Sequence, residues 1–373
     1  MGIYVHVPFC RSKCFYCGFY SVASLKLKEA YLDAIEREIV LSVGYLPQGE
    51  IDTLYFGGGT PSYLDRGDLG RIIRKLEENY SFTTGAERTI ELNPEDLVPE
   101  KLQGIKELGF NRLSIGVQSF SDEQLKRINR THTSRQAREG ITLAANMGFD
   151  NISMDLIIGL PGQTEEELLA DVMLASSLPI VHLSVYMLSI DSNTVFERMV
   201  KQGKFQLEDE EVMAARYQRV CGRLKELGFE HYEISNFTRN GKYSKHNTSY
   251  WQQKPYVGFG PSAHSYDLHS RQWNTANLKT YIESLNCGIL PFEKEELKPV
   301  DLYNEYVMTN LRTMWGIEKQ KLESNYALFW GQVQGQVQKY MKTGNLIEEE
   351  GKLRISEVGW VISDVILSDL FVV

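Results

Sequence analysis

Short apolar runs alternate with amphipathic segments along the first half of the chain. Such runs are typical of buried strands, and apolar residues at helical spacing are typical of surface helices. The six expected strands are residues 3–8, 53–56, 89–92, 112–117, 152–158 and 182–188, and the expected helices between them are about 27–43, 68–79, 99–108, 122–128, 134–147 and 165–178. Strictly alternating units predict a parallel sheet covered by helices. Since six units do not close an eight-stranded barrel, we expect an α/β fold built on a partial (β/α)6 barrel, with its ligands at the C-terminal strand ends.

The pattern changes after about residue 190. We expect a helix at 208–227, a strand at 230–237 and a long, ordered functional loop over 238–277, where Gly, Asn, Ser, Tyr and Trp are frequent. The last part shows helical patterns at 301–314 and 328–343, a strand pair at 346–349 and 352–355, and a terminal helix at 357–370, an order that resembles a winged helix. We therefore expect a barrel (1–230), a loop-rich extension of it (231–298) and a small C-terminal α+β, winged-helix-like domain (299–373).

The composition, 42% hydrophobic and 24% charged, is that of an ordinary globular protein. The net charge of −9 argues against nucleic acid as the main partner, and Glu348, Glu349 and Glu350 in the expected wing would repel phosphate. We therefore prefer a packing or substrate-covering role for that domain over DNA binding. No apolar run approaches the roughly 18 residues of a membrane span, and no basic segment before an apolar core marks a signal peptide. Together with cysteines that read as reduced thiols, these features predict a cytoplasmic protein.

Three of the five cysteines follow the first expected strand. They are Cys10, Cys14 and Cys17, spaced C-x3-C-x2-C. Three thiolates this close can hold three irons of a [4Fe–4S] cube and leave the fourth iron open to a ligand that is not protein. The alternatives are a zinc site completed by His6 or by a distant residue, and three incidental thiols. The other two cysteines lack the spacing of metal ligands.

Polar and glycine-rich motifs follow the next strands. The segment Gly57-Gly58-Gly59-Thr60-Pro61 either lets backbone approach a ligand closely or is a simple turn; it lacks the Lys-Ser/Thr ending of a phosphate-binding loop. Glu91 ends the third strand with a carboxylate suited to ribose hydroxyls, and Gln118 ends the fourth. Arg130 offers a guanidinium suited to a carboxylate, and Asp155 lies on the fifth strand. Alone, each is more often a solvated or locally bonded group, but on successive strands of one sheet they favour a shared ligand.

These motifs resemble those of the radical S-adenosylmethionine (SAM) superfamily, in which SAM binds the open iron and is cleaved reductively to a 5'-deoxyadenosyl radical. The strings YVHVPFC, GGGTP, ELNP, GVQSF and DLIIGLPGQT are similar to the oxygen-independent coproporphyrinogen III oxidase family over nearly the whole chain. The resemblance implies a [4Fe–4S] cluster on the cysteine triad, and it assigns no catalytic residue. By motif position it implies SAM contacts at Tyr4, Tyr16, Gly58, Gly59, Thr60, Glu91, Gln118, Arg130 and Asp155, with Ser189 and His264 as weaker candidates.

Two departures separate the chain from the oxidases of that family. Phe19 stands where the oxidases carry a further cysteine, and the sequence starts at the cluster strand without their longer N-terminal extension. Both features, and the hexapeptide H-N-x-x-Y-W at residues 246–251, resemble the heme chaperone branch, HemW. The resemblance implies heme contacts at His246, Tyr250 and Trp251, since His is a common axial ligand and Tyr and Trp offer flat faces with polar tips. The Gly, Asn and aromatic content of the segment around His246 predicts an exposed recognition surface; the alternative for this hexapeptide is an aromatic-rich packing loop.

The resemblance thus implies a heme chaperone that binds a cluster and SAM and delivers heme, or another tetrapyrrole, to a recipient hemoprotein. It implies a reducing electron donor such as flavodoxin and leaves room for peripheral membrane association. We expect reductive SAM cleavage without oxidase activity. The alternative is a coproporphyrinogen III oxidase, which converts propionates to vinyl groups by oxidative decarboxylation, and a third candidate is another radical SAM transferase acting on a tetrapyrrole.

Overall fold

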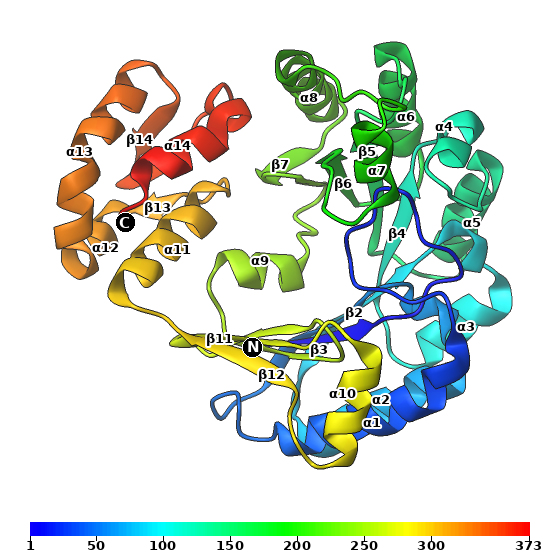
Figure 1. Cartoon of the computed structure of the whole chain (residues 1–373). Helices are drawn as coiled ribbons and strands as arrows, with labels where there is room; N and C mark the ends of the chain where they lie inside the picture. Colours follow the sequence, from blue (N-terminus) through cyan, green and yellow to red (C-terminus); the bar gives the residue numbers. More distant parts are fainter.

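Six parallel strands with helices between them form the centre of the computed structural model, which describes residues 1–373 (Figure 1). The strands are β1 (Gly2–Val7), β2 (Ile51–Gly58), β3 (Phe82–Leu92), β4 (Arg112–Gln118), β5 (Ile152–Ile158) and β6 (His182–Met187). The helices are α1 (Lys28–Leu41), α2 (Arg66–Asn79), α3 (Pro99–Glu107), α4 (Asp122–Arg127), α5 (Ser134–Asn146) and α6 (Glu165–Ser177). The expected partial (β/α)6 barrel is confirmed, since β1 to β6 are neighbours in chain order and each pair is parallel.

Short strands extend this sheet at both edges to twelve strands, in the order β12-β11-β10-β9-β1-β2-β3-β4-β5-β6-β8-β7. After β6 the chain forms α7 (Val195–Lys201), α8 (Glu210–Glu226), β7 (Glu230–Glu233) and β8 (Asn236–Thr238) beside β6. It then crosses to the other edge through α9 (Lys245–Trp251), β9 (Tyr256–Phe259), β10 (His264–Tyr266), β11 (Ser270–Asn274), α10 (Leu278–Asn286) and β12 (Phe292–Glu296). Because β9 pairs parallel with β1, the first strand of the chain is hydrogen-bonded on both sides.

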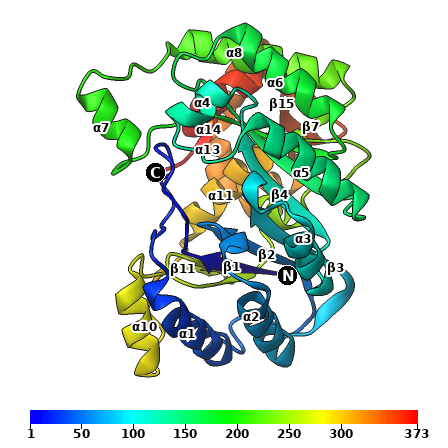
Figure 2. The same cartoon turned by 90° about the vertical axis from the view of Figure 1, so that its right-hand side faces the viewer.

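Alternation of side chains along the parallel strands separates the hydrophobic core from the interior of the barrel. On β4, for example, Leu113, Ile115 and Val117 belong to the core, whereas residues between them line a central cavity. Figure 2 shows helices α1, α2, α3 and α5 on the outer side of the sheet. The apolar faces of the strands are therefore covered by helices, and the polar positions are turned inward.

The expectation of a long loop over residues 238–277 is wrong. This segment contains α9 and the strands β9, β10 and β11, so the expected loop-rich extension is an ordered part of the sheet. Strands β9 and β10 are only 4 and 3 residues long, and a glycine interrupts the apolar pattern of β9. Runs this short do not show the alternation of apolar and polar residues that predicts a strand. The expected strand at 230–237 is divided into the antiparallel hairpin β7–β8.

Helix α9 is held against the barrel by a buried acid on β3. Ser244 is its N-cap and accepts the N–H of Asn247 at 3.4 Å, while Glu87 accepts the N–H groups of Lys245 at 3.1 Å and His246 at 2.9 Å. A carboxylate at a helix N-terminus satisfies free N–H groups and interacts favourably with the helix dipole. Since the segment has few strong helix formers, its helical state depends on this tertiary contact.

The C-terminal part contains α11 (Pro299–Leu311), β13 (Ile317–Glu318), α12 (Lys319–Asn325), α13 (Ala327–Lys342), β14 (Leu346–Glu349), β15 (Lys352–Ile355) and α14 (Ser363–Leu370). Its strands form a separate sheet in the order β13-β15-β14, and Figure 1 shows this part in orange and red beside the barrel. The expected helices and hairpin are present; the short elements β13 and α12 were not expected. None of the helices combines the length and apolar character needed to cross a bilayer.

Substitution of Gly260, between β9 and β10, tests how closely this part of the chain packs on β1. Its φ is +99°, and a Cβ there would collide with the carbonyl oxygen of His6. We expect Gly260→Ala to lower the free energy of unfolding in urea by about 3 kcal/mol or more, from backbone strain plus steric conflict. Gly241→Ala is the control, since its φ is +66° but nothing lies within 4 Å of the added Cβ, and it should cost about 1 kcal/mol. Equal losses would contradict this account.

Candidate functional site

The loop between β1 and α1 carries the three cysteines over the barrel and appears in dark blue in Figure 1. Two backbone hydrogen bonds hold it in place. The N–H of Cys10 donates to the carbonyl of Val22 at 3.1 Å within the loop, and the N–H of Phe15 donates to the carbonyl of Ile128 at 3.2 Å. The side chain of Phe15 packs against a small hydrophobic cluster that contains Ile128 and Phe196. The loop is therefore anchored to the residues that follow α4 and to α7.

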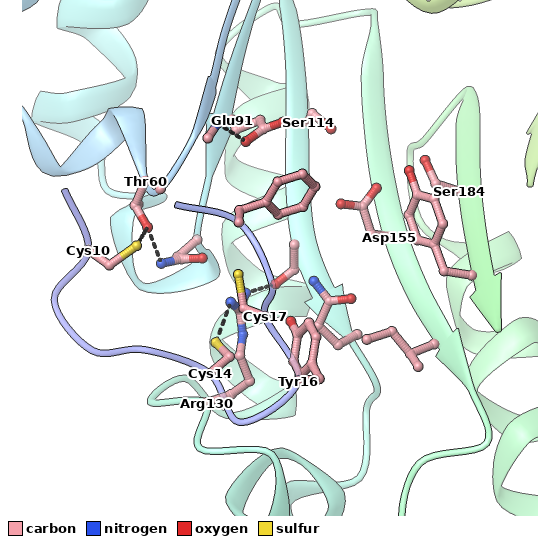
Figure 3. A pocket seen from close by; sticks show the side chains of 18 of the residues that line it. Cys10, Cys14, Tyr16, Cys17, Thr60, Glu91, Ser114, Arg130, Asp155 and Ser184 are labelled. Carbon is pink, nitrogen blue, oxygen red and sulfur yellow. Dashed lines mark hydrogen bonds between the residues drawn. The ribbon is translucent and has the colours of Figure 1, made fainter. Parts of the chain in front are cut away.

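Beneath this loop lies a cavity of about 420 Å³, which the loop and the inward-facing residues of the strands line together (Figure 3). A volume of this order is typical of small-molecule sites. Twelve of the residues expected from the motifs line it: Cys10, Cys14, Tyr16, Cys17, Gly58, Gly59, Thr60, Glu91, Gln118, Arg130, Asp155 and Ser189. The strand-end motifs thus meet at one place in the fold.

The glycine triplet after β2 makes room for the chain that leaves β1. A Cβ on Gly58, whose φ is +105°, would lie 2.6 Å from ring atoms of His6, and a Cβ on Gly59 would lie 2.7 Å from the carbonyl oxygen of Phe9. Thr60 then donates its N–H to the same carbonyl at 2.8 Å. The triplet therefore lets the start of the cysteine loop pass directly over the end of β2.

Two buried carboxyl groups face the cavity from β3 and β5. Glu91 accepts hydrogen bonds from the hydroxyl of Tyr55 at 2.8 Å and from the N–H of Gly58 at 3.2 Å. Burial raises the pKa of Glu91 to about 7; nearby Asp155 adds to the rise, and the two hydrogen bonds oppose it. Burial also raises the pKa of Asp155 to about 6, against a hydrogen bond with Ser184. Carboxyl groups that face a cavity can accept hydrogen bonds from the hydroxyls of a ligand.

Arg130 places a guanidinium against the cysteine loop. Asn129, with φ +61°, turns the chain after α4, and Arg130 then donates from Nη2 to the carbonyl of Gly116 while Nη1 lies 3.5 Å from Sγ of Cys14. Its Nε is buried without a hydrogen-bonding partner, which is costly and marks a place for a ligand acceptor. Gln118, at the end of β4, has a φ of +72°, a conformation that is uncommon outside glycine and is enriched at functional sites.

Five expected residues do not line the cavity: Tyr4, His246, Tyr250, Trp251 and His264. Tyr4 lies on β1, where its hydroxyl is 3.3 Å from Nδ1 of His6. His264 lies on β10, which β9 separates from β1, and its ring is next to that of Trp273. The order of the strands therefore keeps His264 away from the other motif residues.

The expectation of an exposed surface at His246 is wrong. His246 is 1% exposed, its Nδ1 lies 2.8 Å from Oγ1 of Thr53, and its Nε2 lies 2.7 Å from the hydroxyl of Tyr250. Its ring stacks on Tyr55, and burial lowers its pKa to about 3, so it is neutral. Since both ring nitrogens have partners, His246 can ligate iron only if one of these buried contacts breaks. The residue of this motif that reaches the cavity is Asn247.

Several cavity-lining residues were not expected from the motifs. They are Arg112 and Ser114 on β4, Ser153 on β5, and His182 and Ser184 on β6. These residues occupy alternate positions in otherwise apolar strands, and on β4 and β5 they are in phase with the motif residues of the same strand. A period of two in polar residues within buried strands is the signal that would have identified them.

The cysteine set fits an iron–sulfur cluster. Cys10, Cys14 and Cys17 all line the cavity, no other cysteine does, and His6 lies outside it with Nε2 2.9 Å from the carbonyl of Tyr20. The His, Cys, Asp and Glu side chains form no group arranged to hold one ion, whereas the ligands of a cube surround a larger body. Burial raises the pKa of the Cys17 thiol to about 11 and also raises that of Cys10, so ligation would release protons.

Comparison with known proteins places this site in a family. Residues 4–175 match the family model described as the radical SAM superfamily. Heme chaperone HemW of Bacillus subtilis (strain 168) is 36% identical over 327 residues, which cover 87% of this chain and 86% of that protein. Radical S-adenosyl methionine domain-containing protein 1, mitochondrial, of Bos taurus is 31% identical and covers 99% of this chain and 87% of that protein.

The fold matches a solved structure of coproporphyrinogen III oxidase (HemN) from Escherichia coli, a radical SAM enzyme. The TM-score is 0.86 at 24% identity, over 99% of this chain and 89% of that one, which confirms the expected fold. The radical SAM match implies a [4Fe–4S] cluster and SAM, in agreement with the cysteine loop and the cavity. Since the HemW proteins are similar along most of both chains, the branch is also clear. The chain belongs to the HemW branch of the radical SAM, coproporphyrinogen III oxidase-like family.

Proposed function

We propose that this chain holds a [4Fe–4S] cluster on Cys10, Cys14 and Cys17, binds SAM beside it, and acts as a heme chaperone. The observation that carries the proposal is the position of the triad over the same cavity that the strand-end motifs line. Arg130 lies at the contact between the two, 3.5 Å from Cys14. The names of the relatives, heme chaperones in several bacteria, support the chaperone part.

The cluster, when bound, would supply the electron for reductive cleavage of the sulfonium bond of SAM. The residues of the chain would bind and orient SAM. Arg130, with its partnerless Nε, suits the methionyl carboxylate, and Glu91 suits the ribose hydroxyls. The remaining candidates in the cavity are Tyr16, Gly58, Gly59, Thr60, Gln118, Asp155 and Ser189. We do not include Tyr4 and His264, because neither lines the cavity.

Two arrangements of heme are compatible with the sequence. In the first, His246 ligates the iron and Tyr250 and Trp251 contact the ring, which requires His246 to give up its buried contact with Thr53 or with Tyr250. In the second, the cavity holds the tetrapyrrole by shape, and α9 stays in place. The second arrangement is favoured because it leaves the buried hydrogen bonds of α9 intact.

Oxidase activity is the alternative function. The solved oxidase shares the fold, but 24% identity does not extend to its reaction. In this chain Phe19 stands where the oxidases carry a further cysteine, and it lines the cavity and is 69% exposed.

The proposal also includes a recipient hemoprotein, a reducing donor such as flavodoxin, a cytoplasmic location, and room for peripheral membrane association.

The cluster assignment predicts the iron content of cysteine variants. Anaerobically purified protein should carry about four irons per chain, and replacing Cys10, Cys14 or Cys17 by Ala should remove them. Cys221→Ala and Cys287→Ala are the controls, because neither residue lines the cavity. Iron and sulfide analysis measures the content. Loss of iron in either control, to the same degree as in the triad variants, would contradict the assignment.

The SAM assignment predicts a large effect at Arg130. Removing one partner of a buried, hydrogen-bonded ion pair costs about 3–5 kcal/mol, so Arg130→Ala should weaken SAM binding by about two orders of magnitude or more. Arg127→Ala is the matched control, since Arg127 pairs with Glu123 on the surface and is 42% exposed. Calorimetric titration with SAM, at equal iron content, measures the effect. Equal affinity in Arg130→Ala and the parent would exclude a carboxylate partner for Arg130.

The chaperone assignment predicts heme binding without turnover. Reconstituted, anaerobic protein should bind heme and form no protoporphyrinogen IX from coproporphyrinogen III. Because His246 is buried and doubly bonded, we expect His246→Ala to leave the heme absorption spectrum unchanged. A shifted spectrum in folded His246→Ala protein would instead support the first arrangement. Repeated turnover of coproporphyrinogen III by the parent would replace the chaperone assignment by the oxidase one.

A further inference from the structure

Arg112, the first residue of β4, is a buried cation without an anionic partner. It is 2% exposed and lines the cavity. Its single hydrogen bond within the chain goes from Nη1 to the side-chain oxygen of Asn151, and it forms no ion pair. A buried charge without a counter-charge is strongly unfavourable, so such a group in a cavity points to an anionic ligand.

The two guanidinium groups of the cavity are hydrogen-bonded near opposite ends of β4. Arg130 is bonded to the carbonyl of Gly116, four residues after Arg112 on the same strand, which corresponds to about 13 Å along β4. Arg112 bonds in the opposite direction, to the residue that precedes β5. A carboxylate held at Arg130 beside the cysteines therefore does not neutralise Arg112.

Several of the polar side chains near Arg112 in the cavity are neutral, and two of them are without partners. The side chains of Ser114 on β4 and Asn247 on α9 line the cavity and make no hydrogen bond within the chain. His182 also lines it, but its nitrogens lie 2.7 Å from the hydroxyls of Ser153 and Tyr232. Figure 3 shows Ser114 on the side of the cavity away from Cys14.

The nearby acids are already bonded. Asp155 on β5 lines the same cavity and attracts Arg112, but it is hydrogen-bonded to Ser184 and forms no ion pair with Arg112. Glu91, which pairs with Ser114 in the register of the sheet, accepts from Tyr55 and Gly58. Glu87 accepts two N–H groups at the start of α9. This end of the cavity therefore offers a guanidinium, a hydroxyl and an amide, a set of donors that matches a carboxylate.

We propose that Arg112, with Ser114 and Asn247, binds a carboxylate of the tetrapyrrole, one of its propionates. The inference rests on the proposed heme function and on the arrangement in which α9 stays in place. Arg112 is then a specificity-determining residue, because a guanidinium forms two parallel hydrogen bonds with a carboxylate and none of comparable strength with an ester.

The experiment compares heme with heme dimethyl ester, in which both propionates are blocked. Absorbance titrations use the full-length, cluster-loaded parent and the variants Arg112→Gln and Arg112→Lys. The parent should bind heme about tenfold or more tightly than the ester, the loss expected for charge-assisted hydrogen bonds. Arg112→Gln should lose that preference by binding heme more weakly, and Arg112→Lys should retain part of it. Arg135→Gln, at an exposed surface arginine, is the matched control and should keep the preference of the parent.

SAM affinity and iron content are measured in the same proteins, so that the source of the carboxylate is identified. A loss of SAM affinity in Arg112→Gln with an unchanged heme preference would assign Arg112 to the carboxylate of SAM and overturn the proposal. An unchanged preference and unchanged SAM affinity in folded Arg112→Gln would overturn it as well. A parent that binds neither heme nor its ester would overturn the proposed function itself, a result distinct from both.

Asn247→Asp provides the second variant if Arg112→Gln does not fold. This change preserves the size of the side chain and adds a carboxylate that would compete with the ligand for Arg112. We expect the preference for heme over its dimethyl ester to fall about tenfold or more in Asn247→Asp. An unchanged preference in this variant would count against the proposal in the same way.

Discussion

The pairing of β1 on both sides is the constraint on which the rest of the structure depends. β2 pairs with one edge of β1. β9, which comes much later in the chain, pairs with the other edge. The cysteine loop therefore leaves the sheet at its centre, and Gly58, Gly59 and Gly260 give its first residues their room. With β1 at an edge, the same cysteines would lie at the border of the sheet, away from the inward-facing residues of β4 and β5.

The parallel core could be predicted from the sequence, whereas the edges of the sheet could not. Strands β1 to β6 are buried on both faces and alternate with helices, so their signal is contained in neighbouring residues. Strands β9 and β10 are short and are defined by partners that are distant in sequence. Helix α9 is the clearest case, because the carboxylate of Glu87 that caps it belongs to β3.

The candidate site also has residues that the sequence predicts and residues that it does not. Motifs at strand ends identified Glu91 and most other residues near the cysteines, because strand ends converge in this fold. Arg130 was identified in the segment that follows α4. Arg112 was overlooked because a charged residue at the start of a strand is usually solvated, whereas in the assembled sheet Arg112 is buried and lines the cavity. His246 was expected on the surface for the same reason: a polar, aromatic segment is typical of an exposed loop, and its partner Thr53 is distant in the sequence.

The contact between Arg130 and Cys14 has a consequence for electron transfer. Positive charge and hydrogen bonds at cluster sulfurs raise the reduction potential, so a guanidinium 3.5 Å from Sγ makes a cluster held there easier to reduce. A ligand carboxylate that pairs with the same guanidinium cancels part of this charge and lowers the potential again. Arg130 would therefore link occupancy of the ligand site to the charge beside Cys14, and so to the reduction potential of a cluster held there.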